Sequence, residues 1–153
     1  MEAPREKVLR KVGEWLARAD EDLQLATYAL TMQAQAPPYR LVAYHAQQCA
    51  EKCLKAFLVY HNVEFPYTHN IRRLLMLCES HATWAHVLRE AEELTAYAIT
   101  ARYPGEDTVV TEEEARRAVS VAERVRSQVR TALRELGMES IREEPLPGSP
   151  AEG

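Results

Sequence analysis

Residues 39–61 read YRLVAYHAQQCAEKCLKAFLVYH, and this stretch decides the fold. Its apolar side chains recur every three or four positions, which is the spacing of one face of an α-helix. The stripe consists of Val42, Ala46, Cys49, Ala50, Cys53, Phe57 and Tyr60. The spacing therefore predicts an amphipathic helix over residues 39–61, with this stripe buried.

Helical spacing continues on both sides of this stretch. Before it, apolar residues from Val8 to Leu30 alternate at steps of four and three, which is an a/d seam. Pro37 and Pro38 end that first helix, because proline cannot donate to the helical ladder. After it, residues 62–67 are expected to form a loop, and Thr68 is a plausible N-cap for a short third helix.

Two more helices complete the pattern. Residues 83–101 carry a fourth apolar set, which ends at a Pro-Gly breaker at residues 104–105. Thr111 and Glu114 form a capping box for a fifth helix, and Gly137 is a good residue to follow its end. With no strand pattern and no repeat, we predict an all-α, up-and-down bundle of four to five helices over residues 1–137. Residues 138–153 have the composition of a disordered acidic tail.

Composition narrows the class of protein. The 153 residues suit one domain, and 46% hydrophobic with 27% charged residues is an ordinary globular mixture. No apolar run is long enough to span a membrane, and we expect no membrane association. Three cysteines without a secretion signal predict reduced thiols and a cytoplasmic protein. The 18 basic and 19 acidic residues before Met138 leave the body near neutral, so any contact with RNA or nucleotide must be local.

Four segments in order carry a family resemblance. They are residues 17–23 (ARADEDL), residues 44–56 (YHAQQCAEKCLKA), residues 66–70 (PYTHN), and the run from Tyr97 through residues 101–105 (ARYPG). Together they resemble the HEPN family. The resemblance implies a bundle of four or five helices that commonly forms a symmetric homodimer. It also implies a separately encoded MNT-type nucleotidyltransferase as partner, in a toxin–antitoxin-like pair.

The resemblance implies one of two roles, metal-independent ribonuclease or binding module. The ribonuclease branch uses an Arg-x4–6-His motif near the start of the last long helix. Arg102 occupies that place, but no histidine follows it, or occurs anywhere after His86. Arg40 and His45 have the right spacing at a different place in the chain, and they are the weak catalytic candidates.

Six residues are the candidates for binding a ligand: Arg102, Tyr103, Lys52, Lys55, Gln48 and His69. Arg102 and Tyr103 suit a phosphate and a base, or else they cap the fourth helix and pack against the fifth. Lys52 and Lys55 suit phosphate, or else their stems cover the core while the ammonium groups reach water. His69 either faces a ligand or belongs to the cap of the third helix.

His45, Cys49 and Cys53 follow one another on one helix face, which is a spacing that also occurs in helical zinc sites. A closed zinc site needs four ligands, so small buried cysteines and an interior histidine are the preferred interpretation. We predict no metal and no cofactor. The sequence favours a HEPN-like module that binds a nucleotide or another phosphate-bearing ligand beside a nucleotidyltransferase. An endoribonuclease and a purely structural interaction bundle remain the alternatives.

Overall fold

The computed structural model describes residues 1–33, 35–98 and 109–138, and all of its regular structure there is helical. In chain order the elements are α1 (Pro4–Ala29), α2 (Tyr39–Tyr60), α3 (Ile71–Cys78), η1 (Thr83–Ala98) and α4 (Glu112–Glu135). Five helices and no strand in the described residues confirm the predicted all-α bundle. None of these helices is both long enough and apolar enough to cross a membrane.

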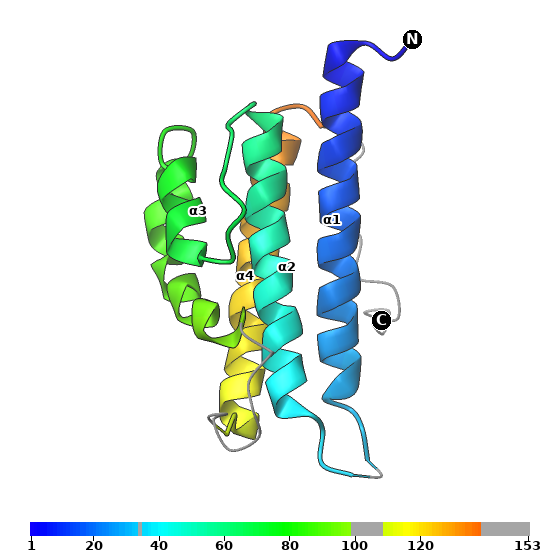
Figure 1. Ribbon diagram of the computed structural model, residues 1–153, viewed down its shortest axis with the longest axis vertical. Coiled ribbons are helices and arrows are strands. Elements are labelled where there is room, and N and C mark those ends of the chain that lie inside the picture. The colour runs from blue at the N-terminus through cyan, green and yellow to red at the C-terminus, as the bar shows by residue number, and fades with distance from the viewer. Residues whose placement is uncertain (34, 99–108, 139–153) are drawn as a thin grey trace.

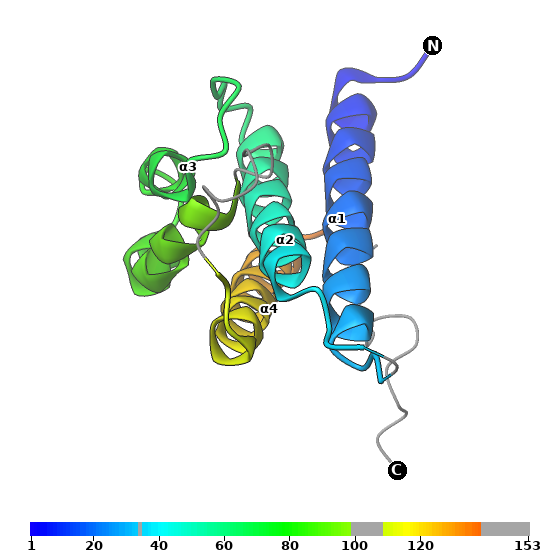
Figure 2. The ribbon, with the colours of Figure 1, turned by 60° about the horizontal axis from the view of Figure 1, so that its bottom comes forward.

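Helix α2 is the centre of the bundle. It lies between α1 on one side and α3 with η1 on the other, while α4 runs behind it (Figures 1 and 2). It packs against every other helix, whereas α1 meets α4 only slightly. Fourteen of its 22 residues are buried, more than one face of a helix can supply. The helix is therefore enclosed on most sides, and its buried polar residues have to find partners inside the protein.

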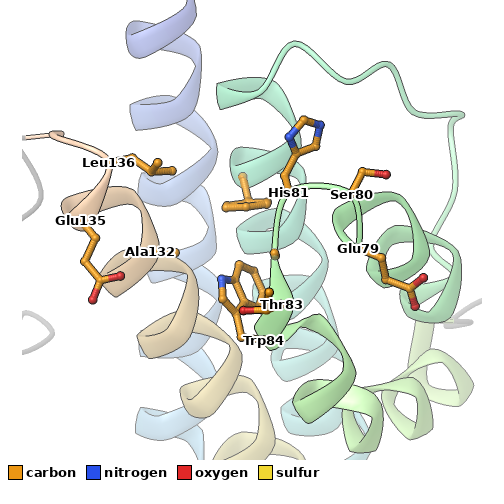
Figure 3. Close-up of a pocket in the computed structure, with 10 residues that line it drawn as sticks. Glu79, Ser80, His81, Thr83, Trp84, Ala132, Glu135 and Leu136 are labelled. Atoms are coloured by element: carbon orange, nitrogen blue, oxygen red, sulfur yellow. The ribbon is translucent and has the colours of Figure 1, made fainter.

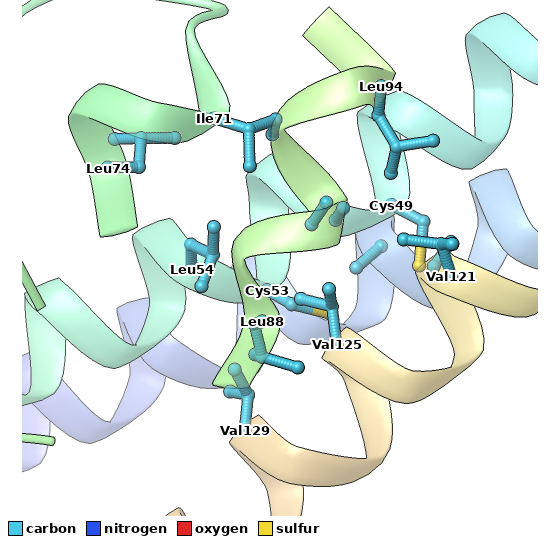
Figure 4. Packing of buried hydrophobic residues seen from close by; sticks show 14 of the residues in the cluster. Cys49, Cys53, Leu54, Ile71, Leu74, Leu88, Leu94, Val121, Val125 and Val129 are labelled. Atoms are coloured by element: carbon cyan, nitrogen blue, oxygen red, sulfur yellow. The ribbon is translucent and has the colours of Figure 1, made fainter. Parts of the chain in front are cut away.

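The apolar core fills the space around α2, and all five described helices contribute to it. Cys49 lies beside Val121, and Cys53 lies beside Val125 (Figure 4). The small thiols let α2 and α4 approach closely, and leucines of α3 and η1 close the other side. As predicted, the apolar stripe of residues 39–61 packs into this core.

Two helix ends follow the sequence signals and one differs. The capping box is present: the Thr111 hydroxyl accepts from Glu114 N at 3.1 Å, and the Glu114 carboxylate accepts from Thr111 N at 3.3 Å. Gly137 follows α4 with a φ of 99°. The N-cap of α3, however, is Asn70, whose side chain accepts from Arg73 N at 3.1 Å. The Thr68 hydroxyl instead accepts from Asn70 N, so it orders the turn before the helix.

The predicted fourth helix takes a different form. Residues 83–98 wind as 3-10 turns with a break at Leu88, where φ is −92° and ψ is 16°. Ala85, Leu88, Ala91 and Leu94 still face the core, whereas Val87 is exposed. The predicted disordered tail falls almost wholly outside the described residues. Its first residue, Met138, is described and is buried.

Candidate functional site

Four polar side chains of α2 are buried: Gln47, Gln48, Glu51 and Lys55. Charged groups are rarely buried unless they are paired. Their partners come from α1 and from the segment of residues 61–70 that joins α2 to α3. These contacts define a polar face on α2.

Glu51 is the hub of the first cluster on this face. Its carboxylate accepts from Lys55 Nζ at 3.1 Å and from Gln47 Nε2 at 3.2 Å, and it lies 2.7 Å from His69 Nδ1. Gln47 Nε2 also donates to the backbone oxygen of His69 at 3.1 Å, and Gln48 Nε2 donates to Gln47 Oε1 at 2.7 Å. The cluster therefore joins the connecting segment to α2 and fixes how the His69 ring is turned.

The Lys55 ammonium lies inside an aromatic enclosure. Its Nζ is 5.5 Å from the ring centre of Trp15, 5.7 Å from that of Phe65 and 5.9 Å from that of Tyr67. These distances are within the range of cation–π attraction. The side chain is 6% exposed, so the ammonium does not reach water. The expectation that Lys55 covers the core while its head is hydrated is therefore wrong, because Glu51 and three rings replace the water.

Asp22 of α1 is the hub of the second cluster. One of its carboxylate oxygens lies 2.8 Å from His45 Nδ1, and the other accepts from Lys52 Nζ at 2.5 Å. A carboxylate that accepts from Nδ1–H fixes the ring's orientation and leaves Nε2 facing away as the second polar atom. His45 and Lys52 keep about a quarter of their side chains exposed, whereas Asp22 is nearly buried.

The structure brings most of the predicted ligand residues into these two clusters. In the second cluster, Asp22 contacts both Lys52 and His45. In the first cluster, Glu51 contacts both Lys55 and His69. Gln48 belongs to the first cluster through its hydrogen bond to Gln47. Each lysine is already paired with a carboxylate. Their positive charges are therefore balanced within the protein.

Among the described sequence candidates, Arg40 is not joined to the clusters. Arg40 is exposed at the start of α2, and it is five residues from His45. Residues five apart on an α-helix project about 140° apart, so these two side chains point in different directions. Arg102 and Tyr103 lie outside the described residues.

A second candidate surface lies on α1. Lys11, Glu14, Trp15 and Arg18 line a hollow of about 320 Å³ there. Glu14 is paired with Arg10 at 2.8 Å. Within the described residues, neither Lys11 nor Arg18 has an acidic partner. Because positions 11, 15 and 18 share one helix face, Lys11 and Arg18 lie on either side of Trp15 along the helix.

A comparison with known families decides the classification. The HEPN domain matches residues 12–132, which is most of the chain and includes both polar clusters. The chain belongs to the HEPN domain family. No curated protein and no solved structure matches the chain in the corresponding searches.

Several residues of this HEPN domain were not among the sequence candidates. Asp22 and Glu51 hold the two histidines, and Trp15 with Tyr67 encloses Lys55. A signal existed for Asp22, which directly precedes Leu23 of the buried seam of the first helix. An acidic residue beside a buried seam requires a partner, but the sequence does not say which helix supplies it.

The thiols of this HEPN domain belong to the core. Cys49, Cys53 and Cys78 are free and buried. A hydrogen bond with Cys53, followed by burial, raises the pKa of Cys49 well above its usual range, and burial raises the pKa of Cys78 to about 12. Thiolate formation is therefore disfavoured at both positions. No group of three His, Cys, Asp or Glu side chains in the described ranges is arranged to hold a metal ion.

Proposed function

We propose that this HEPN domain is a binding module for a nucleotide or another phosphate-bearing ligand, and that it acts with a separately encoded nucleotidyltransferase. One observation carries the proposal. The Trp15 ring is flanked by Lys11 and Arg18, which have no acidic partner within the described residues. Flat rings stack on nucleobases, and free cations attract phosphate.

The cluster around Glu51 and Lys55 packs against the buried side of this surface. The Trp15 ring that lines the hollow also packs against Phe65, with ring centres 6.4 Å apart, and covers Lys55. Lys55 is held by Glu51. We infer that the buried pair positions Trp15, while Lys11 and Arg18 contact phosphate. Arg102 and Tyr103 stay in the proposal as residues expected from sequence.

Isothermal titration of the purified full-length chain with AMP, ADP and ATP tests the proposal. We expect saturable binding that weakens roughly tenfold or more in the Lys11→Ala/Arg18→Ala chain, since hydrogen bonds to charged groups contribute on the order of 1.5–3 kcal/mol. Arg72→Ala/Arg89→Ala is the matched control, because it removes the same charge from exposed positions of α3 and η1. Equal affinities in the two double variants, or no binding to the native chain, would show the proposal to be wrong.

The partner and the assembly state belong to the same proposal. The symmetric homodimer is tested by light scattering across a range of protein concentrations, where a constant monomer mass counts against it. A nucleotidyltransferase encoded beside the chain is tested by co-expression. If the two proteins do not copurify, the proposed partner is wrong. The nucleotide titration still tests the proposed ligand independently.

Endoribonuclease activity is the second candidate, and the Asp22–His45 contact favours it. An imidazole oriented through Nδ1 by a carboxylate keeps Nε2 for proton transfer, and Lys52 lies beside the same carboxylate. The test is incubation with labelled cellular RNA in a metal chelator. Cleavage that disappears in His45→Ala and persists in His86→Ala, an exposed histidine of η1, would establish this activity. RNA that stays intact with the native protein would exclude it for that RNA pool.

A further inference from the structure

A second cavity lies where the turn between α3 and η1 meets the end of α4. Its volume is about 430 Å³. Trp84 extends from the start of η1 toward α4 and forms one wall, and His81 lies on the turn (Figure 3). Phe57 of α2 and Leu136 after α4 complete the apolar lining. A cavity of this size is large enough for a small organic molecule.

The aromatic walls are held in place by ring contacts. The rings of Phe57 and Trp84 meet edge to face, with centres 4.9 Å apart. His81 stacks on His61 at 4.3 Å with an angle of 18° between the rings. Because these rings support one another, the cavity is preformed and an aromatic face is available to a ligand.

The charge at the cavity is negative. Glu79 at the end of α3 and Glu135 at the end of α4 lie on opposite sides of it (Figure 3). Both are exposed, and neither has an ion-pair partner among the residues that the structure describes. The nearby guanidinium of Arg5 is already held by Tyr60, whose ring it covers at 4.4 Å. Two carboxylates and electron-rich rings together favour a cation.

A neighbouring histidine packs behind the wall of the cavity. His61 contacts Phe57 and His81, two residues that line the cavity. Its Nε2 is buried and has no hydrogen-bond partner in the described part of the chain. Burial first, and then His81 and Arg5, lower the pKa of His61, so this ring stays neutral near pH 7 and does not oppose a cation. A buried polar atom without a partner is costly, and the ring contacts with Phe57 and His81 hold His61 in this position.

We propose that this cavity binds a small organic ammonium ion. The apolar body of the ion packs against Trp84 and Phe57, and Glu79 and Glu135 balance its charge. This site is distinct from the cationic surface around Trp15, and it takes a ligand of the opposite charge. The proposal therefore does not depend on the nucleotide titration.

Phenethylammonium chloride is the probe, and 2-phenylethanol is its neutral counterpart. Calorimetric titration of the full-length chain is expected to show saturable binding of the amine at least about fivefold tighter than of the alcohol, because each surface ion pair contributes up to ~1 kcal/mol. The chain has two tryptophans, so Trp15→Phe leaves Trp84 as the only one. Its fluorescence is expected to change with the same saturation curve, which places the amine at this cavity.

The Glu79→Gln/Glu135→Gln chain is expected to lose about fivefold in affinity for the amine and to bind the alcohol unchanged. Glu64→Gln/Glu113→Gln is the control, because it removes two exposed carboxylates elsewhere. Thermal unfolding confirms that both chains remain folded. Three results would each overturn the proposal: no saturable binding of the amine, equal affinity for amine and alcohol, or equal losses in the two double variants.

Discussion

Lys55→Met is the most informative test of the buried polar face. Methionine keeps the length and the apolar body of the lysine stem and removes only the charge. Glu51, whose side chain is 4% exposed, is then left buried without its cation. Breaking a buried ion pair in this way costs about 3–5 kcal/mol. We expect the lower end, about 3 kcal/mol, because Gln47 Nε2 and His69 Nδ1 remain beside the carboxylate.

The aromatic enclosure contributes little to this loss. Three rings lie between 5.5 and 5.9 Å from the Lys55 ammonium, and a buried cation–π contact contributes about 1–2 kcal/mol. Methionine recovers part of it, because its sulfur also packs well against aromatic rings. Most of the expected loss therefore comes from the uncompensated carboxylate. That conclusion can be tested by removing Glu51 as well.

The Lys55→Met/Glu51→Gln chain is expected to be more stable than Lys55→Met alone. The neutral amide removes the buried charge and still accepts from Gln47 and His69 with its oxygen. We expect a coupling energy of roughly 2 kcal/mol between the two sites. Urea unfolding of the native chain, Lys55→Met, Glu51→Gln and the double variant measures the four free energies that the coupling requires. An unchanged slope with denaturant confirms that the folded and unfolded states are comparable.

A matched pair on the surface is the control. Glu112 and Arg116 are also four residues apart on a helix, with more than half of each side chain exposed. Arg116→Met is expected to cost less than about 0.5 kcal/mol, because water replaces the lost partner. The argument is refuted if Lys55→Met costs no more than Arg116→Met. It is also refuted if the Lys55 and Glu51 losses simply add.

Four further outcomes follow from single residues. The pKa of His61 is lowered in the folded chain, so the unfolded chain binds a proton there more readily. The free energy of unfolding therefore falls as the pH drops below about 6.5. His61→Phe is expected to reduce this fall, as measured by urea unfolding at pH 7.5 and pH 5. Gly137→Ala, at a φ of 99°, is expected to cost about 1 kcal/mol in the same assay through backbone strain. Thr111→Ala removes the N-cap of α4 and is expected to cost about 1 kcal/mol, which a lowered melting temperature would reveal. With a thiol pKa of about 12 and full burial, Cys78 is expected to react with Ellman's reagent only after unfolding.

The helices could be predicted because their signals are local. Apolar spacing located α1, α2 and α4, and the Thr111 capping box and Gly137 marked the two ends of α4. Residues 83–98 have the same apolar spacing, but spacing does not distinguish 3-10 turns from an α-helix. Thr68 and Asn70 are both good caps, and the choice between them depends on the turn that Thr68 itself forms.

The candidate site was only partly predictable, because its contacts join distant segments. Gln48, Lys52, Lys55 and His69 were named from sequence, but their partners were not. Asp22 is 23 residues from His45, and Glu51 is 18 residues from His69. Helical periodicity shows which face of a helix a residue lies on, but it does not show which residue of another segment that side chain will contact. It therefore left Lys55 as either a phosphate-binding or a hydrated cation, although the fold surrounds it with Glu51 and aromatic rings.

The buried charges are difficult to explain by stability alone. Apolar residues of similar size generally stabilise a protein at least as well as a buried ion pair does. What Glu51 and Asp22 provide instead is orientation: each holds one imidazole through Nδ1, and each fixes a lysine. Glu51 also ties the segment before α3 to α2, and this segment supplies Phe65, which packs on Trp15. The interior charges therefore set the position of the surface ring between Lys11 and Arg18. Under the proposed function, Lys55→Met is therefore expected to weaken nucleotide binding through the displaced Trp15 ring. The double variant with Glu51→Gln is expected to recover stability without recovering affinity.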